Sequence, residues 1–267
     1  MAKFGFSQSV QRVEDERFLI GKGRFSDDLN LSGQAWGWVL RSPHAHAQIL
    51  HIDTVKAASS PGVIDIITGI ELEKADVNHV PTLVPMTNID GTAAPLPRHP
   101  ILCKDRVLHV GDSVAAVVAE DPYIATDALE LIEVDYEVLE ATVGAKATTE
   151  DGKPLVHDEI ENNISFKWGL GDREACDKAF EEADHVVKLD LINQRMIANA
   201  MEPRACAAQW TAATEDMTVW TTSQNPHIIR FGLSAVTLPM LDEHKLRVIS
   251  PDVGGGFGSK IFHYPEE

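Results

Sequence analysis

Short extended segments make up most of the first half of the chain. Apolar and β-branched residues predict five strands there, and the run over 62–69 is apolar enough for a buried strand. The predicted strands cover residues 35–40, 47–52, 62–69, 113–120 and 133–139. A short helix over 53–59 and a long loop over 82–100, which holds four prolines, separate them.

The helix between the last two of these strands has a well-marked start. Asp121 is a favourable N-cap, and Pro122 suits the first helical position. Apolar residues then recur at helical spacing on one face. They are Ile124, Ala128, Leu129 and Ile132. The order strand, helix, strand predicts a mixed α/β unit.

The second half opens with a polar connection, 141–163, and a domain boundary is predicted near its start. Asp172 then caps a predicted helix. The residues that share its apolar face are Ala175, Ala179, Phe180 and Ala183. Directly afterwards the apolar period changes to two, with Val187, Leu189 and Leu191 on one side. This alternation predicts a half-buried strand.

The last part of the chain predicts a hairpin, a helix and a strand. Residues 205–210 and 217–222 flank a turn, and Asn225–Pro226 opens the helix. Its apolar stripe comprises Ile229, Leu233 and Val236. The strand over 245–249 then leads into a glycine-rich segment, PDVGGGFGSK, at residues 251–260.

The composition is that of an acidic globular protein of 267 residues. Its 23 basic and 41 acidic residues give a formal charge of −18, which disfavours nucleic acid as a partner. The longest apolar run, 114–119, is too short to be a transmembrane segment, and no secretion signal is visible. Three widely spaced cysteines predict neither disulfides nor a metal cluster, and reduced thiols fit a cytoplasmic location. Cys176 and Cys206 are predicted to be small core residues.

The glycine-rich segment is a candidate ligand-binding loop. Glycine has no Cβ and reaches positive φ at little cost, so a glycine run lets main-chain N–H groups converge on an anion or oxo group. Neither common nucleotide motif fits. Ser259 stands where a dinucleotide loop needs glycine, and Lys260 follows this serine instead of preceding it. A tight turn after a strand is the alternative, and the residues alone leave both open.

Five further positions carry candidate chemistry. Gln224 lies between a strand and a helix, where α/β folds commonly bind ligands, although a surface glutamine beside a capping Asn225 is favoured from the residues alone. His44 and His46 would share one side of a strand, which suits a metal site, but a structural role is favoured.

Glu202 and Arg204 in the stretch MEPR form a candidate buried pair near the same crevice. Ordering of the strand that follows them is the favoured alternative.

Seven stretches, taken together, resemble the large, molybdenum-binding subunit of the xanthine oxidase family of molybdenum hydroxylases. They are GKGRFSDDL, RSPHAHAQI, GDSVAAVVAE, ALELIEVDYEVL, NQRMIANAMEPR, WTTSQNPH and ISPDVGGGFGSK. The form NQR…AMEPR is similar to bacterial three-subunit enzymes that resemble aerobic carbon monoxide dehydrogenase. The resemblance implies an α+β fold, with an aldehyde oxidase/xanthine dehydrogenase a/b hammerhead domain over 18–140. The incomplete start of a molybdopterin cofactor-binding domain would follow over 141–267.

The resemblance also implies site residues. The glutamine of the family's T-Q motif sits beside the apical oxo ligand of molybdenum, a role that falls on Gln224. The main chain of the glycine–phenylalanine loop contacts the oxo group and the pterin side. That role falls on Gly255, Gly256, Phe257 and Gly258. Gln224 and Phe257 would therefore approach the metal through its oxo ligand. The glutamate general base is expected beyond Glu267, so no catalytic residue is assigned within the chain.

The implied function is oxidoreduction of a small molecule. It is either insertion of water-derived oxygen into an aldehyde or N-heterocycle, or oxidation of carbon monoxide. The implied cofactor is molybdenum–molybdopterin in its cytosine dinucleotide form, with 2Fe–2S clusters and FAD on partner subunits. The expected partners are the remainder of the large subunit, an iron–sulfur subunit and an FAD-binding subunit.

The family's large subunit is several hundred residues longer, so the chain alone is expected to be inactive. A split subunit, a truncated reading frame and an excised fragment all stay open. Two other functions compete with the enzyme interpretation. One is a catalytically inactive paralogue or fragment that acts as a binding or assembly module, and the other is a stand-alone anion-binding domain.

Overall fold

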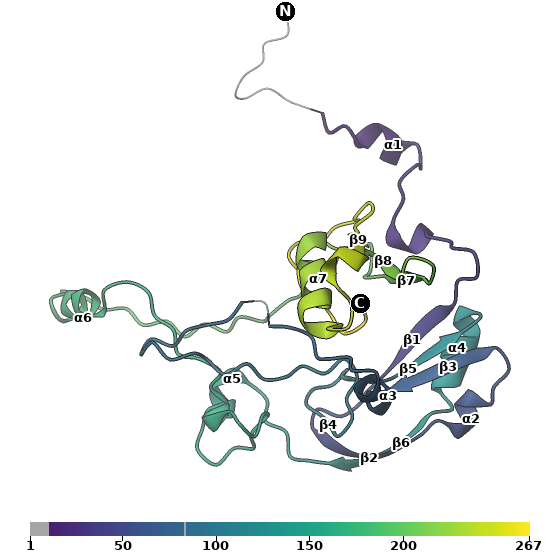
Figure 1. Ribbon diagram of the computed structural model, residues 1–267. Helices are drawn as coiled ribbons and strands as arrows, with labels where there is room; N and C mark the ends of the chain where they lie inside the picture. Colours follow the sequence, from purple (N-terminus) through teal and green to yellow (C-terminus); the bar gives the residue numbers. More distant parts are fainter. Residues whose placement is uncertain (1–10, 83) are drawn as a thin grey trace, which may run out of the picture.

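The computed structural model describes residues 11–82 and 84–267, and its first half contains two three-stranded antiparallel sheets (Figure 1). The first sheet has the order β1 (Trp36–Arg41), β5 (Ser113–Ala119) and β3 (Val63–Thr68). The second has the order β4 (Arg106–Val107), β2 (Ala47–Asp53) and β6 (Glu133–Val138). All five strands that the sequence predicts in this half are confirmed as strands.

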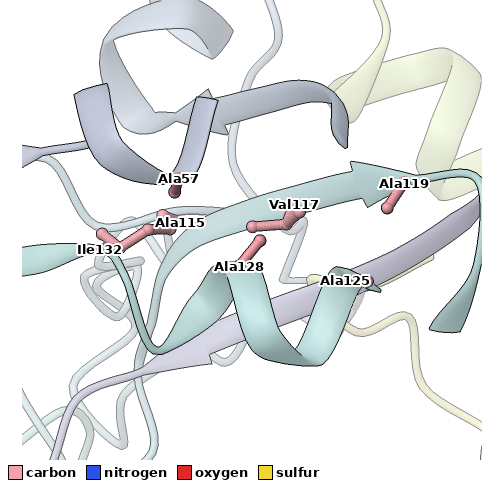
Figure 2. Close-up of a cluster of buried hydrophobic side chains, with 7 residues drawn as sticks. All are labelled: Ala57, Ala115, Val117, Ala119, Ala125, Ala128 and Ile132. Carbon is pink, nitrogen blue, oxygen red and sulfur yellow. The ribbon is translucent and has the colours of Figure 1, made fainter. Parts of the chain in front are cut away.

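Small side chains let two helices lie close to the first sheet. α4 (Pro122–Leu129) begins after Asp121, whose Oδ1 accepts a hydrogen bond from the N–H of Tyr123 at 2.7 Å, so the predicted cap is confirmed. The second helix is α2 (Val55–Ala58). Figure 2 shows the buried cluster that these elements form with β5: Ala57, Ala115, Val117, Ala119, Ala125, Ala128 and Ile132. A larger side chain at Ala128 would overpack this contact, at a cost of roughly 1–3 kcal/mol.

The chain turns directly from β3 into α3 (Gly69–Lys74). Thr68 caps this helix, because its Oγ1 accepts from the N–H of Ile70 at 3.3 Å and its own N–H donates to Glu71 at 3.1 Å. A Cβ on Gly69 would lie 2.8 Å from the carbonyl oxygen of Leu102. Glycine is therefore required where α3 meets the segment before β4.

The second half contains a third sheet, covered by a helix on one face (Figure 1). Its elements in chain order are β7 (Cys206–Thr211), β8 (Asp216–Thr221), α7 (Pro226–Gly232), a π-helical turn η3 (Leu233–Thr237) and β9 (Leu246–Ile249). β7 and β8 form the predicted hairpin, whereas β9 pairs with β8 in parallel. Ile229 and Leu233 of the predicted apolar stripe are buried against this sheet.

The remaining helices are short. They are α1 (Asp15–Leu19), η1 (Ser26–Asp28), α5 (Ala145–Thr148), η2 (Glu161–Asn163), α6 (Arg173–Glu181) and η4 (Glu243–Lys245). Asp172 caps α6 as predicted, accepting from the N–H of Ala175 at 3.0 Å. Figure 1 shows α6 standing away from the three sheets. In the described part of the chain, no helix is both long and apolar enough to cross a membrane.

Three burial predictions from the sequence are wrong. β3 is an edge strand rather than a buried one, and the side chain of Ile64 faces outward. The predicted strand at Val187 to Leu191 does not form, and its three apolar side chains are exposed, since no strand in the described part of the chain offers it hydrogen-bond partners. Cys176 and Cys206 are both exposed and are not core residues; Cys176 is exposed because no described residue packs on the apolar face of α6.

Candidate functional site

Two parallel strands bring the candidate residues to one edge of the third sheet. β8 and β9 pair from Met217–Leu246 to Trp220–Ile249, so their carboxyl ends lie side by side. Gln224 follows the end of β8, and the glycine-rich segment follows the end of β9. Such an edge is where α/β sheets commonly bind ligands.

Three hydrogen bonds join Gln224 to the glycine loop, here defined as residues 254–260. Its Oε1 accepts from the N–H of Gly258 at 3.0 Å and from the N–H of Lys260 at 3.3 Å. Its own main-chain N–H donates to the carbonyl oxygen of Lys260 at 2.8 Å. Asn225, the expected helix cap, makes no side-chain cap of α7. The predicted glutamine and the predicted loop thus form one structural unit.

The side-chain amide of Gln224 has a defined direction in this unit. Because Oε1 receives two loop N–H groups, the amide nitrogen Nε2 is the free end, and it can only donate. Among the described residues, no acceptor contacts the main-chain N–H groups of Gly255, Gly256 or Phe257. Together these groups offer four unused donors beside one sheet edge.

Backbone conformation explains why glycine recurs in the loop. Gly255 and Gly258 have φ values of 100° and 92°, in the region that favours glycine. Gly256 needs to be glycine for a different reason, since a Cβ there would lie only 2.3 Å from Oε1 of Gln224. Phe257 has a φ of 51° and a side chain that points outward, so its contribution to the unit is its main chain.

A buried ion pair between Lys260 and Glu202 holds the C-terminal end of the glycine loop. The sequence does not predict this pair. Lys260 is 2 % exposed, and its Nζ donates to the main-chain oxygen of Glu202 at 2.7 Å and to Oε2 of Glu202 at 3.1 Å. The same Oε2 accepts from the N–H of Gly254 at 2.6 Å. The signal was a lysine two residues after the last glycine of the loop, but nothing local in the sequence points to a partner 58 residues away.

The loop is also held from the N-terminal side. Both terminal nitrogens of Arg17 donate to the carboxylate of Asp252, and the N–H of Arg24 donates to Oδ2 of Asp252 at 2.7 Å. The hydrogen bond and charge of Arg17 lower the pKa of Asp252 to about 2. Arg17 and the main chain of Arg24 therefore hold Asp252, which lies two residues before the first glycine of the loop.

Arg204 does not pair with Glu202, so the candidate pair from the sequence is wrong. Its guanidinium instead binds the side chain of Glu267 and lies 3.9 Å from the ring centre of Tyr264. The two residues of MEPR thus hold different parts of the C-terminal segment: Glu202 binds Gly254 and Lys260, and Arg204 binds Glu267.

The histidine pair lies in the first half of the chain, in the segment that leads into β2. His46 Nδ1 is 2.8 Å from the carbonyl oxygen of Glu140, and the ring of His44 packs edge-on against Tyr136 at 4.9 Å. Across the residues that the structure describes, no group of histidine, cysteine, aspartate or glutamate side chains is arranged to hold a metal ion.

The chemistry of the loop suits an anionic oxygen atom. Three main-chain N–H groups and one amide nitrogen are all donors without charge, and they can stabilise an oxo group without a titrating partner. No cluster of metal-binding side chains lies here among the residues that the structure describes. The residues therefore fit a cofactor that presents oxygen atoms to the protein.

Two family models match the chain. The model described as "Aldehyde oxidase and xanthine dehydrogenase, a/b hammerhead domain" matches residues 20–140. The model described as "Molybdopterin cofactor-binding domain" matches residues 156–267. The first covers the two sheets of the first half, and the second covers the third sheet with Gln224 and the glycine loop.

Known proteins similar to the chain are large subunits of oxidoreductases. It is 37 % identical to the carbon monoxide dehydrogenase large chain of Afipia carboxidovorans, over 97 % of this chain and 32 % of that protein. It is 35 % identical to the nicotine 6-hydroxylase large subunit of Paenarthrobacter nicotinovorans, over 97 % of this chain and 30 % of that one. The crystal structure of quinoline 2-oxidoreductase from Pseudomonas putida 86 matches with a TM-score of 0.85 and 33 % identity, over 97 % of this chain and 32 % of that chain.

The chain thus spans about a third of the length of the proteins it matches. Its α+β fold is a hammerhead domain followed by the start of a molybdopterin cofactor-binding domain. It belongs to the xanthine oxidase family of molybdenum hydroxylases and corresponds to part of their large, molybdopterin-binding subunit.

Proposed function

We propose that this chain holds the oxo and pterin side of the molybdenum–molybdopterin cofactor within a molybdenum hydroxylase. The observation that carries the proposal is a group of donors without an acceptor among the described residues, Gln224 Nε2 and the N–H groups of Gly255, Gly256 and Phe257, on one unit joined by hydrogen bonds. Gly258 contributes its conformation, since its own N–H is already donated to Gln224. Gln224 would hold an oxo group of the cofactor through Nε2.

The bound cofactor supplies the redox chemistry, while the protein supplies orientation and electrostatics. Gln224 donates to an oxygen through Nε2, and its position is fixed because Oε1 is anchored to the loop. The glycines keep side-chain atoms out of the space in front of the N–H groups. A preorganised donor set of this kind needs no reorganisation when negative charge increases on the oxygen.

The proposed reaction is oxidation of a small molecule. It is either insertion of water-derived oxygen into an aldehyde or N-heterocycle, or oxidation of carbon monoxide. Relatives named for carbon monoxide, nicotine and quinoline all align over nearly the whole chain. We therefore infer that the residues that select the substrate lie outside the aligned third. We assign the general base and the substrate-selecting residues to the remainder of the large subunit.

The proposed assembly includes 2Fe–2S and FAD subunits, and the proposed cofactor form is the cytosine dinucleotide. A cytoplasmic location completes the proposal, and three free cysteines are compatible with it.

The first proposed partner is the remainder of the large subunit. Apolar side chains over 186–201 are exposed in a segment without regular structure, and α6 beside it has no buried residue. The most exposed of them are Val187, Leu191, Ile192, Met196 and Met201. An exposed apolar stretch of this length is a feature of an interaction surface. We propose that the rest of the large subunit covers it and pairs with the alternating residues as a strand.

The proposal is tested on the large subunit that contains this chain, coexpressed with its partner subunits in a host that makes the cofactor. Molybdenum is measured by mass spectrometry and the pterin by fluorescence after oxidation. We expect stoichiometric molybdenum in the parent and a reduced content in Gln224→Ala. Gln209→Ala, at an exposed position on β7, is the matched control and should load normally. A parent that folds and assembles without molybdenum would favour the binding-module alternative.

A further inference from the structure

The glycine loop cannot fix its own shape. Glycine has more accessible backbone conformations than any other residue, so a run of glycines loses the most entropy when it is ordered. The donors at Gly255, Gly256 and Phe257 are useful only if their directions are constant. Something outside the run therefore has to restrain it.

One carboxylate oxygen restrains both ends of the loop at once. Oε2 of Glu202 accepts from the N–H of Gly254 at 2.6 Å and lies 3.1 Å from Nζ of Lys260. The contact at the first end is close, since a Cβ on Gly254 would lie 2.5 Å from Cβ of Glu202. Glu202 thus closes the segment 254–260 into a ring. Its other oxygen, Oε1, is buried and has no partner among the described residues.

Lys260 is buried to a degree that its charge makes unusual. Lysine is rarely buried unless it is paired, because transfer of an ammonium group out of water is costly. Here the Nζ has a carboxylate oxygen and a main-chain oxygen as partners, both from Glu202. The pair joins the two ends of the glycine loop, because the carboxylate that binds Lys260 also accepts from the N–H of Gly254.

The same lysine holds Gln224 through its main chain. The N–H of Lys260 donates to Oε1 of Gln224, and the carbonyl oxygen of Lys260 accepts from the N–H of Gln224. A displacement of Lys260 therefore changes where the amide of Gln224 points. Glu202, Lys260 and Gln224 form a continuous chain of contacts from a buried charge to a free donor.

We propose that Glu202 and Lys260 are positioning residues that set the direction of the Gln224 amide and of the free loop N–H groups toward the cofactor. The inference rests on the proposed function of the loop. Neither residue donates to the cofactor; each acts through the loop backbone and Gln224. The pair converts a flexible glycine run into a rigid donor surface.

The test uses Lys260→Met in the large subunit coexpressed with its partner subunits. Methionine keeps most of the apolar stem and the main-chain bonds to Gln224 but removes the Nζ contacts. Lys56→Met is the matched control, because Lys56 forms an exposed ion pair with Glu133 on the hammerhead domain. Three quantities are compared: molybdenum content, the molybdenum(V) electron paramagnetic resonance spectrum, and kcat and KM for each molybdenum.

We expect Lys260→Met to shift the paramagnetic spectrum and to lower kcat per molybdenum on the order of 10-fold or more, with a smaller change in KM. Lys56→Met should match the parent in all three. A purely structural ion pair would lower the loaded fraction but leave the spectrum and kcat per molybdenum unchanged, and that result would overturn the inference. A parent without molybdenum would instead overturn the proposed function itself.

A second measurement is independent of metal loading. Hydrogen exchange of the Gly258 and Lys260 amides is followed by mass spectrometry in this chain and in the variant. The restraint model expects exchange on the order of 10-fold faster in Lys260→Met, with unchanged rates in the strands of the hammerhead domain. Equal loop rates in both proteins would show that the pair does not restrain the loop.

Discussion

The guanidinium group of Arg17 forms a bidentate contact with the carboxylate of Asp252, which lies 235 residues further along the chain and two residues before Gly254. The segment around α1 is otherwise exposed. This contact links the N-terminal segment 17–24 to the site. The geometry of the loop therefore depends on three distant segments: residues 17–24, the stretch MEPR and the end of β8.

The Arg17–Asp252 contact predicts a pH response. The pKa of Asp252 is lowered to about 2 from an ordinary 3.8, so the contact stabilises the fold above pH 3.8 and is lost as the pH falls toward 2. Arg17→Met should return the pKa of Asp252 toward 3.8. A carboxyl-detected NMR titration of the two proteins measures this directly. Arg12→Met is the control, because Arg12 pairs with Asp15 and not with Asp252. An unchanged Asp252 titration in Arg17→Met would contradict the assignment.

His263 predicts a second and separate pH response. Burial, with a smaller effect of Arg204, lowers its pKa from 6.5 to about 4. The unfolded chain therefore takes up a proton that the folded chain does not, and stability falls as the pH drops from 6.5 to 4. The fall amounts to at most about 3 kcal/mol.

His263→Leu should remove this part of the pH dependence, since neither ring nitrogen of His263 has a partner in the described residues. Denaturant unfolding at pH 7 and pH 4.5 gives the comparison. His51→Leu, at an exposed position on β2, should keep the parental slope. If the unfolding free energy of His263→Leu changed with pH as much as that of the parent, His263 would not be the cause of the pH dependence.

Gly256→Val should be more damaging to cofactor retention than Phe257→Ala. Any Cβ at Gly256 collides with the side-chain amide of Gln224, whereas alanine at position 257 keeps the main-chain N–H and removes only an outward ring. Molybdenum content and activity per molybdenum in the assembled enzyme measure both. Gly37→Val is the control, because a Cβ at Gly37 meets nothing within 4 Å. Equal or reversed losses at 256 and 257 would contradict a role for the backbone.

Gln224→Glu separates the two functions of this side chain. A carboxylate still accepts from the N–H groups of Gly258 and Lys260, so the loop should keep its shape. The outward donor is replaced by an acceptor with a negative charge, and activity per molybdenum should fall on the order of 10²–10³-fold. Hydrogen exchange at the loop provides the internal control. Parental turnover in this variant would remove Gln224 from the donor set.

Thiol labelling tests whether the rest of the large subunit packs on α6. Cys176 is exposed on α6 in this chain, whereas Cys103 is buried and its pKa is raised to about 12 by burial. A maleimide should label Cys176 rapidly and Cys103 only after unfolding. In the complete large subunit, labelling of Cys176 should slow on the order of 10-fold or more if the rest of the subunit covers α6. The same rate in both proteins would contradict the proposed docking.

Local pattern predicted most of the elements, and it failed where an element depends on a distant partner. The caps at Asp121 and Asp172 act within three residues, so the sequence shows them directly. The alternation at Val187 to Leu191 is equally clear, yet a strand requires a neighbour to accept its hydrogen bonds. The ion pair of Glu202 with Lys260 was missed for the same reason, because it joins segments 58 residues apart.

Because β8 and β9 pair in parallel, the relative position of Gln224 and the glycine loop does not depend on the segment that connects the two strands. The connection through α7, η3 and η4 leaves one strand and returns at its neighbour, while the spacing of the strands themselves is set by main-chain hydrogen bonds. That connection can lengthen, shorten or change composition without altering the distance from Gln224 to the loop. Sequence variation among relatives is accordingly expected to concentrate in this connection, while the ends of β8 and β9 keep their positions.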